Sequence, residues 1–230
     1  MKRRDFLKAT GSSMLTMSVV GEAGHAADTR PNILIIMTDQ QFADGMSCVL
    51  GRRYLHTPNI DALAEGGVRF TRAYAPNPLC MPMRTSMMTG LYPHQTGVQT
   101  NNKTQLRPTG LELGEIFKNA GYKTAYFGKW HVALEDQGGF ETFVGRDARM
   151  NPEFAAAFLK QDHDRPFLAV ASFLSPHEIC EWSRRQSLPG KELDPVPPLE
   201  ERPPLRENSE PPANETDIMT HMRKSYQAYT

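Results

Sequence analysis

Three runs along this chain have the length and composition of strands buried in a sheet. Residues 32–37 read Asn-Ile-Leu-Ile-Ile-Met, residues 123–127 read Lys-Thr-Ala-Tyr-Phe, and residues 167–173 read Phe-Leu-Ala-Val-Ala-Ser-Phe. Continuous apolar runs of this kind are typical of strands that are covered on both faces in a parallel sheet. A further short strand is expected at residues 68–74.

Segments with helical signals alternate with these runs. Thr57 and Pro58 are typical of a helix start, and the Gly-Gly pair at residues 66–67 is typical of its end. A second helix is expected to be capped by Thr109 and to end at Gly121, and a third is expected to begin at residues 151–152. The alternation predicts an α/β fold with a mainly parallel sheet and helices on both faces. Ligands of such sheets bind beyond the carboxyl ends of the strands.

Composition narrows the possible partners. The chain has 230 residues, 26 basic and 26 acidic side chains and 39% apolar residues. Its length and apolar content fit one domain with a core, and the balanced charge does not suggest a nucleic-acid partner. No stretch approaches the roughly 18 uninterrupted apolar residues of a membrane span.

Both ends of the chain differ from the α/β pattern. Residues 1–27 resemble a twin-arginine signal peptide, because Lys-Arg-Arg precedes a weakly apolar stretch and small residues. The resemblance implies export by the Tat translocase to the periplasm or beyond, and leaves residues 28–230 as the mature domain. Residues 181–217 hold eight prolines and no apolar periodicity. They are expected to form a surface excursion, with a disordered linker as the alternative, and residues 218–230 are expected to open a helix.

The segment 80–90 carries the candidate chemistry. Pro82 suits the first turn of a helix, and Gly90 suits its end. Cys80 would then lie at a helix N-terminus, where unpaired N–H groups and the helix dipole favour an anion. The alternative is a buried, inert cysteine.

Cys80, Pro82 and Arg84 form a Cys-x-Pro-x-Arg core that resembles the formylglycine signature of the sulfatase family, in the alkaline phosphatase superfamily. Residues 32–40, 57–64, 128–131 and 172–177 are similar to other elements of the family, in the family's order. The resemblance implies an alkaline-phosphatase-like fold and hydrolysis of a small-molecule or carbohydrate sulfate ester. It also implies that a maturation enzyme oxidises Cys80 to an aldehyde, formylglycine, whose hydrate is the nucleophile.

The resemblance also implies a role for each remaining site residue. Arg84 would orient the nucleophile at position 80, and Lys129 would contact the sulfate oxygens. His131 would help the second hydroxyl of the hydrate to expel sulfate, and His177 would protonate or bind the leaving oxygen. These are the groups that sulfate transfer requires: a nucleophile, cationic neutralisation and an acid.

A divalent cation, most suitably calcium, is implied at Asp39, Gln40 and Cys80. Gln40 stands where family members often have a second aspartate, so the site loses one negative charge and is expected to bind weakly. Met83 stands where many members have serine. This leaves the Cys-Pro-Arg core intact.

The largest departure from the family is length, because members usually continue and supply further metal ligands. The chain is therefore expected to be a truncated, N-terminal portion of the catalytic domain, with low activity and an unpaired sheet edge. Two alternatives remain: a phosphonate or phosphate ester hydrolase of the same superfamily, and a non-catalytic remnant that binds anions. The sequence leaves open whether Cys48 and Cys180 pair.

Overall fold

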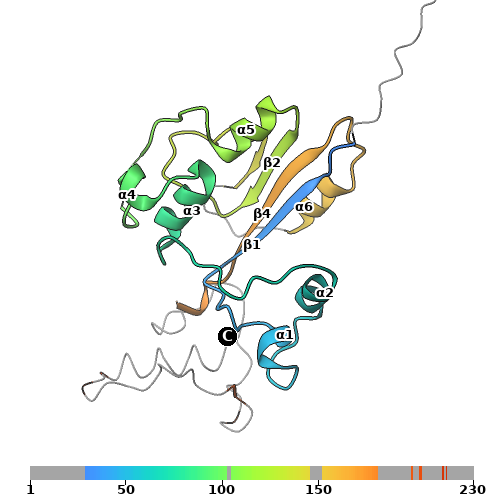
Figure 1. Ribbon diagram of the computed structural model, residues 1–230, viewed down its shortest axis with the longest axis vertical. Helices are drawn as coiled ribbons and strands as arrows, with labels where there is room; N and C mark the ends of the chain where they lie inside the picture. The colour runs from blue at the N-terminus through green and yellow to red at the C-terminus, as the bar shows by residue number, and fades with distance from the viewer. Residues whose placement is uncertain are drawn as a thin grey trace, which may run out of the picture. The chain divides into compact units, whose positions relative to one another are not determined.

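The computed structural model describes residues 29–102, 105–145 and 152–180, together with positions 198, 202–203, 214 and 216. The expected signal peptide, proline-rich excursion and final helix fall almost entirely outside the described residues. The elements, in chain order, are β1 (Ile33–Asp39), α1 (Ser47–Leu50), α2 (Pro58–Gly66), α3 (Cys80–Thr89), α4 (Pro93–Thr96), α5 (Leu113–Asn119), β2 (Lys123–Gly128), β3 (Thr142–Val144), α6 (Pro152–Leu159) and β4 (Phe167–Pro176) (Figure 1).

The described strands form one parallel sheet with the order β1-β4-β2-β3. The last strand, β4, lies between β1 and β2, so that Leu168 is opposite Ile33 on one side and Thr124 on the other. The three predicted buried strands are confirmed as β1, β2 and β4. Their carboxyl ends lie at the same edge of the sheet because the strands are parallel.

Helices cover both faces of the sheet, as the sequence predicts. On one face α3 and α5 pack over the side chains of the central strands, and on the other α6 does so. The first cluster contains Met88, Tyr126, Trp130, Leu168 and Val170, and the second contains Ala125, Phe127, Ala155, Phe158 and Ala169. Each large apolar side chain buried in these layers contributes about 1.5–3 kcal/mol to folding.

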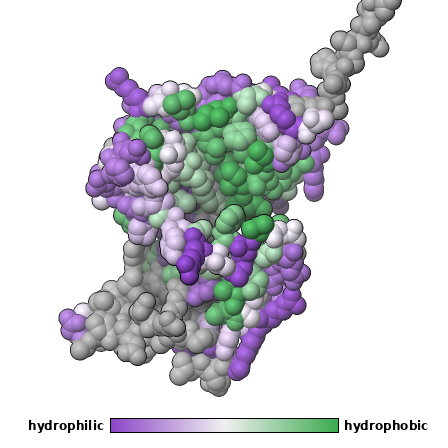
Figure 2. All heavy atoms as spheres, in the orientation of Figure 1, coloured by the Kyte–Doolittle hydropathy of each residue, from purple (hydrophilic) through white to green (hydrophobic). Residues whose placement is uncertain are grey.

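The edge strand β1 keeps exposed apolar side chains. Leu34 and Ile36 are 42% and 57% exposed, and apolar side chains gather over the sheet on the face seen in Figure 2. Within the described residues β1 pairs only with β4. Within the part of the chain that the structure describes, β1 is therefore an apolar edge strand.

Two local predictions are wrong. Residues 68–74 form no strand, and Val68, Phe70 and Tyr74 are 81%, 79% and 84% exposed. No described strand pairs with this segment, and strand propensity without a neighbour does not make a strand. Thr109 does not cap α5, because the N-cap is Glu112, whose carboxylate instead accepts bonds from the Thr109 amide (2.6 Å) and hydroxyl (2.9 Å).

The helix after the cysteine motif forms as predicted. α3 begins at Cys80 itself, has Pro82 in its first turn, and ends at Gly90, which adopts the left-handed φ of 71°. The Gly90 amide donates to the Ser86 carbonyl at 2.8 Å and closes the last turn. Among the described residues, no helix has the length and apolarity needed to cross a membrane.

Candidate active site

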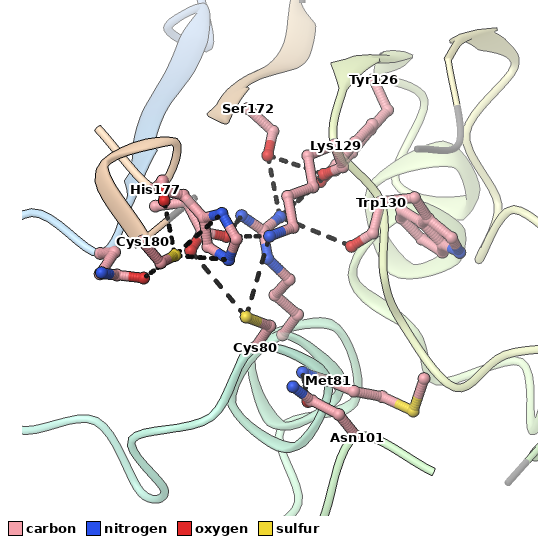
Figure 3. A network of polar contacts seen from close by, with 12 residues as sticks. Cys80, Met81, Asn101, Tyr126, Lys129, Trp130, Ser172, His177 and Cys180 are labelled. Atoms are coloured by element: carbon pink, nitrogen blue, oxygen red, sulfur yellow. Dashed lines mark hydrogen bonds and ion pairs between the residues drawn. The ribbon is translucent and has the colours of Figure 1, made fainter. Parts of the chain in front are cut away.

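The site is assembled at the carboxyl edge of the sheet. Asp39 is the last residue of β1, Lys129 directly follows β2, and His177 directly follows β4. The N-terminus of α3 brings Cys80 to the same place (Figure 3). Loops that follow neighbouring parallel strands converge there, which is why residues so distant in sequence meet.

Asp39 stands at the centre of the cluster. Its Oδ2 accepts a bond from Arg84 Nη2 at 2.9 Å and one from Lys129 Nζ at 2.7 Å. The three side chains are 8%, 3% and 9% exposed. Burial by itself raises the pKa of Asp39, but hydrogen bonds and positive charge from Lys129 and Arg84 outweigh burial and hold it below the usual range. Asp39 is therefore a carboxylate that neutralises one of two adjacent cations.

Cys80 lies against this ion pair. Its Sγ is 3.8 Å from Lys129 Nζ and 3.9 Å from Asp39 Oδ1. A pocket of about 330 Å³ opens here, and Asp39, Cys80 and Arg84 line it together with Gln40, Met83 and others. The predicted neighbours of the nucleophile position, Arg84 and Lys129, are therefore brought to it.

Arg84 also joins the loop after β2 to β4. Its Nη1 donates to the Lys129 carbonyl at 2.8 Å and to Ser172 Oγ at 2.9 Å. That same carbonyl accepts bonds from the hydroxyls of Ser172 and Tyr126, at 2.7 and 2.5 Å. Burial raises the pKa of Tyr126, so its hydroxyl keeps the proton that it donates. One guanidinium thus fixes the backbone that carries Lys129.

Ser172 and Tyr126 were not predicted from the sequence. Ser172 is fully buried in the middle of an apolar strand, and Tyr126 is a fully buried phenol. Buried hydroxyls need hydrogen-bond partners. This rule indicates that each has a partner, but it does not identify the partner.

His177 closes the site on the side of β4. Three side chains here each offer one possible metal-ligand atom: Asp39, Cys80 and His177. These three atoms lie within 4.8 Å of one another. The buried thiol of Cys180 lies 3.7 Å from His177 Nδ1 and 3.3 Å from Gln40 Oε1. Gln40 reaches this position with a left-handed φ of 62°.

Cys180 is a third residue whose place in the site was not predicted from the sequence. Its position three residues after His177 was the available signal, since one turn of chain returns the side chain to the histidine. None of Cys48, Cys80 and Cys180 is in a disulfide, and Cys48 is exposed whereas Cys180 is buried. The open question of a Cys48–Cys180 pair is answered in the negative for this structure.

His131 lies two residues beyond Lys129 on the loop that follows β2. It is half-buried and has a φ of 44°, a conformation uncommon outside glycine. The Ala133 amide donates to Thr85 Oγ1 at 3.1 Å and anchors this loop to α3. The role of His131 in the reaction stays a prediction.

The described residues offer oxygen ligands, which a hard divalent cation prefers, but they offer fewer of them than such a cation takes. Asp39 Oδ1 and the Gln40 amide oxygen are suitable ligands, whereas calcium takes six to eight oxygens. Asp39 Oδ2 is already bonded to Arg84 and Lys129. The described residues thus form part of a cation site.

The fold and the charges define a class of protein. A parallel α/β sheet presents two buried cations, one carboxylate and a cysteine at a helix N-terminus, which suits hydrolases of tetrahedral anion esters. The sulfatase family profile matches residues 31–229. The chain belongs to the sulfatase family, and family membership makes a metal-dependent site the expectation for this cluster.

Similar proteins agree with this family. The ulvan-active sulfatase of Formosa agariphila is 34% identical over an aligned length of 185 residues, and the match covers 65% of this chain and 36% of the relative. A solved 2-O GAG sulfatase is 30% identical, with a TM-score of 0.62 over 78% of this chain and 42% of the other. The phosphonate monoester hydrolase of Agrobacterium radiobacter is 25% identical, with a TM-score of 0.53 over 65% and 42%.

The structural neighbours and the sheet together confirm the alkaline-phosphatase-like fold, of which this chain is a part. The chain spans less than half of the length of each of these three proteins, at 36%, 42% and 42%.

Proposed function

We propose that the protein hydrolyses sulfate monoesters, with formylglycine made from Cys80 as its nucleophile. The observation that carries the proposal is the contact of Cys80 with the buried Asp39–Lys129–Arg84 cluster, in a chain of the sulfatase family. Two cations and one carboxylate leave one net positive charge. This charge suits the single negative charge of a sulfate monoester.

The side chains have distinct roles in this proposal. The hydrated aldehyde at position 80 supplies an oxygen nucleophile and a second hydroxyl whose deprotonation releases sulfate. Lys129, held 3.8 Å from the position 80 sulfur, binds a sulfuryl oxygen and offsets charge that grows in the transition state. His177 gives a proton to the leaving oxygen, and His131 takes the proton of the second hydroxyl. Arg84 orients the nucleophile and holds the Lys129 loop.

Calcium is the proposed cation. Asp39 Oδ1, Gln40 Oε1 and the oxygen that replaces sulfur at position 80 would be its ligands from the described residues. The cation would supply Lewis-acid polarisation of the sulfate group.

A carbohydrate sulfate is the proposed substrate class, supported by the ulvan-active and GAG sulfatases among the similar proteins. Residues 1–27 are proposed to direct export by the Tat translocase to the periplasm or beyond. Folding before export would let a formylglycine-generating maturation enzyme act on Cys80 first.

The test combines a chemical and a kinetic readout. Protein produced together with a maturation enzyme is digested, and the peptide that contains position 80 is analysed by mass spectrometry for the aldehyde. The same protein is assayed on matched aryl sulfate, phosphate and phosphonate esters beside Cys80→Ala. An aldehyde at position 80 and sulfatase turnover that Cys80→Ala abolishes are expected. Turnover that survives Cys80→Ala contradicts the proposal.

A phosphonate or phosphate ester hydrolase is the second candidate, favoured by the structural similarity to a phosphonate monoester hydrolase. The same cations suit either tetrahedral anion. Faster turnover of the phosphonate ester than of the matched sulfate ester would support this alternative.

A further inference from the structure

We propose that, before Cys80 is converted, the site binds a thiophilic divalent cation such as Zn²⁺ through Cys80, Asp39 and His177. This inference concerns the unmodified thiol. It rests on the proposed function only in that conversion removes the ligand. The cation differs from calcium in its chemistry, since zinc prefers sulfur and nitrogen ligands and calcium prefers oxygen.

The distances suit a single small ion. Zinc binds thiolate sulfur, imidazole nitrogen and carboxylate oxygen at about 2.0–2.3 Å, so tetrahedral ligands lie roughly 3.3–3.8 Å apart. Cys80 Sγ and Asp39 Oδ1 are 3.9 Å apart, and all three ligand atoms lie within 4.8 Å of one another. A contraction of these separations by up to about 1.5 Å therefore brings the three atoms to bonding distance of one ion.

The two carboxylate oxygens of Asp39 have different partners. Oδ2 takes the bonds from Arg84 and Lys129, at 2.9 and 2.7 Å, whereas Oδ1 faces the sulfur. A metal ion at Oδ1 leaves both ion pairs in place. Asp39 can thus ligate the metal without releasing the cations that hold the strand ends together.

The unconverted thiol favours zinc through its charge as well as through its sulfur. Lys129 and Arg84 against Asp39 leave one net positive charge, which repels a dication. On coordination the Cys80 thiol loses its proton to solvent, and the thiolate brings the protein groups at the site to net neutrality. Conversion to an aldehyde replaces the soft sulfur ligand by oxygen, which suits calcium better than zinc, so we expect zinc to bind only before conversion.

Cys180 serves as a positioning residue in this proposal. Its Sγ lies 3.7 and 3.9 Å from the two ring nitrogens of His177 and 2.7 Å from the His177 carbonyl. These contacts hold the imidazole beside Asp39 and Cys80. Three protein ligands plus solvent complete a four-coordinate site, as in zinc sites that keep one open position.

The experiment uses the chain produced without a maturation enzyme and Co²⁺ as a spectroscopic substitute for Zn²⁺. Thiolate-to-cobalt charge-transfer absorption reports sulfur ligation, and competition with Zn²⁺ gives its affinity. Wild type, Cys80→Ser, His177→Ala and Cys180→Ser are compared, with Cys48→Ser as the exposed-cysteine control. Circular dichroism of each variant establishes that it is folded.

We expect saturable binding with an intensity that corresponds to one thiolate. Cys80→Ser should abolish the charge-transfer band and lower Zn²⁺ affinity at least tenfold, His177→Ala should lower affinity, and Cys48→Ser should leave both unchanged. Cys180→Ser should keep the band. Absence of binding, or a band that survives Cys80→Ser, overturns the proposal. Neither outcome bears on sulfatase turnover of the converted protein.

Alkylation provides a second readout that does not depend on any variant. Zn²⁺ should protect Cys80 from a thiol reagent while exposed Cys48 reacts at its usual rate, as measured by peptide mass spectrometry. Equal alkylation of Cys80 with and without Zn²⁺ overturns the proposal.

Discussion

Replacing Arg84 with alanine should destabilise the fold more than any surface charge substitution. The guanidinium is 3% exposed and donates to Asp39, to the Lys129 carbonyl and to Ser172, all within 2.9 Å. Alanine leaves a buried carboxylate with one cation instead of two and removes a donor from a buried carbonyl. Breaking a buried ion pair by removing one partner costs about 3–5 kcal/mol.

Arg84→Lys is the milder companion variant. It keeps the charge, but a single ammonium does not reproduce the planar fork that spans Asp39, the Lys129 carbonyl and Ser172. Loss of one or two hydrogen bonds from a charged donor should cost about 1.5–3 kcal/mol. The Arg84→Ala variant should therefore have a lower free energy of unfolding than Arg84→Lys, and both variants should have a lower one than the wild type.

Urea denaturation followed by circular dichroism measures these differences as changes in the free energy of unfolding. The matched control is Arg52→Ala, because Arg52 is 75% exposed and pairs with Asp61 at 3.6 Å. Because the Arg52 side chain is largely exposed to solvent, its ion pair with the buried Asp61 should contribute about 1 kcal/mol or less. If Arg84→Ala costs no more than Arg52→Ala, Arg84 does not stabilise the strand ends and the reasoning is refuted.

Three further predictions concern other parts of the chain. Gly139→Ala should cost more than about 2 kcal/mol in thermal denaturation, since φ is 84° and a Cβ there collides with the Glu115 backbone. Gly66→Ala is the control, since no described atom lies within 4 Å of the added Cβ, and it should leave the stability of the fold unchanged or raise it. Equal effects of Gly139→Ala and Gly66→Ala would contradict the close contact described at Gly139. Burial alone raises the pKa of Asp61, but bonds from two hydroxyls and a backbone amide hold it below 3.8. The unfolded state thus protonates first as pH falls, so the stability that Asp61 contributes is present above about pH 3.8 and lost as pH falls through the folded pKa. The stability gap between wild type and Asp61→Asn in urea should shrink on acidification, and a constant gap would show that the carboxylate is not the cause. Calcium should bind weakly in calorimetric titration and more tightly to Gln40→Asp, whereas tight stoichiometric binding by wild type would mean that other ligands lie in the chain.

Local sequence patterns predicted where many of the site residues lie. The run 32–37 places Asp39 after a strand, the run 123–127 does the same for Lys129, and the run 167–173 precedes His177. Parallel strands bring these three positions to one edge, and a helix start at Cys80 was visible from Pro82. The candidate residues that the structure joins were therefore predictable from local pattern plus one general rule about α/β sheets.

Other features depended on which segments meet. Nothing in the sequence says that β4 lies between β1 and β2, or that the Lys129 carbonyl collects the hydroxyls of Tyr126 and Ser172. The strand predicted at residues 68–74 failed for the same reason, since a strand exists only when a neighbour offers its backbone groups. Periodicity along the chain determined the elements and the residue types at their ends. Hydrogen bonds and charge contacts between segments remote in sequence depend on the three-dimensional packing, and only the tertiary structure decided them.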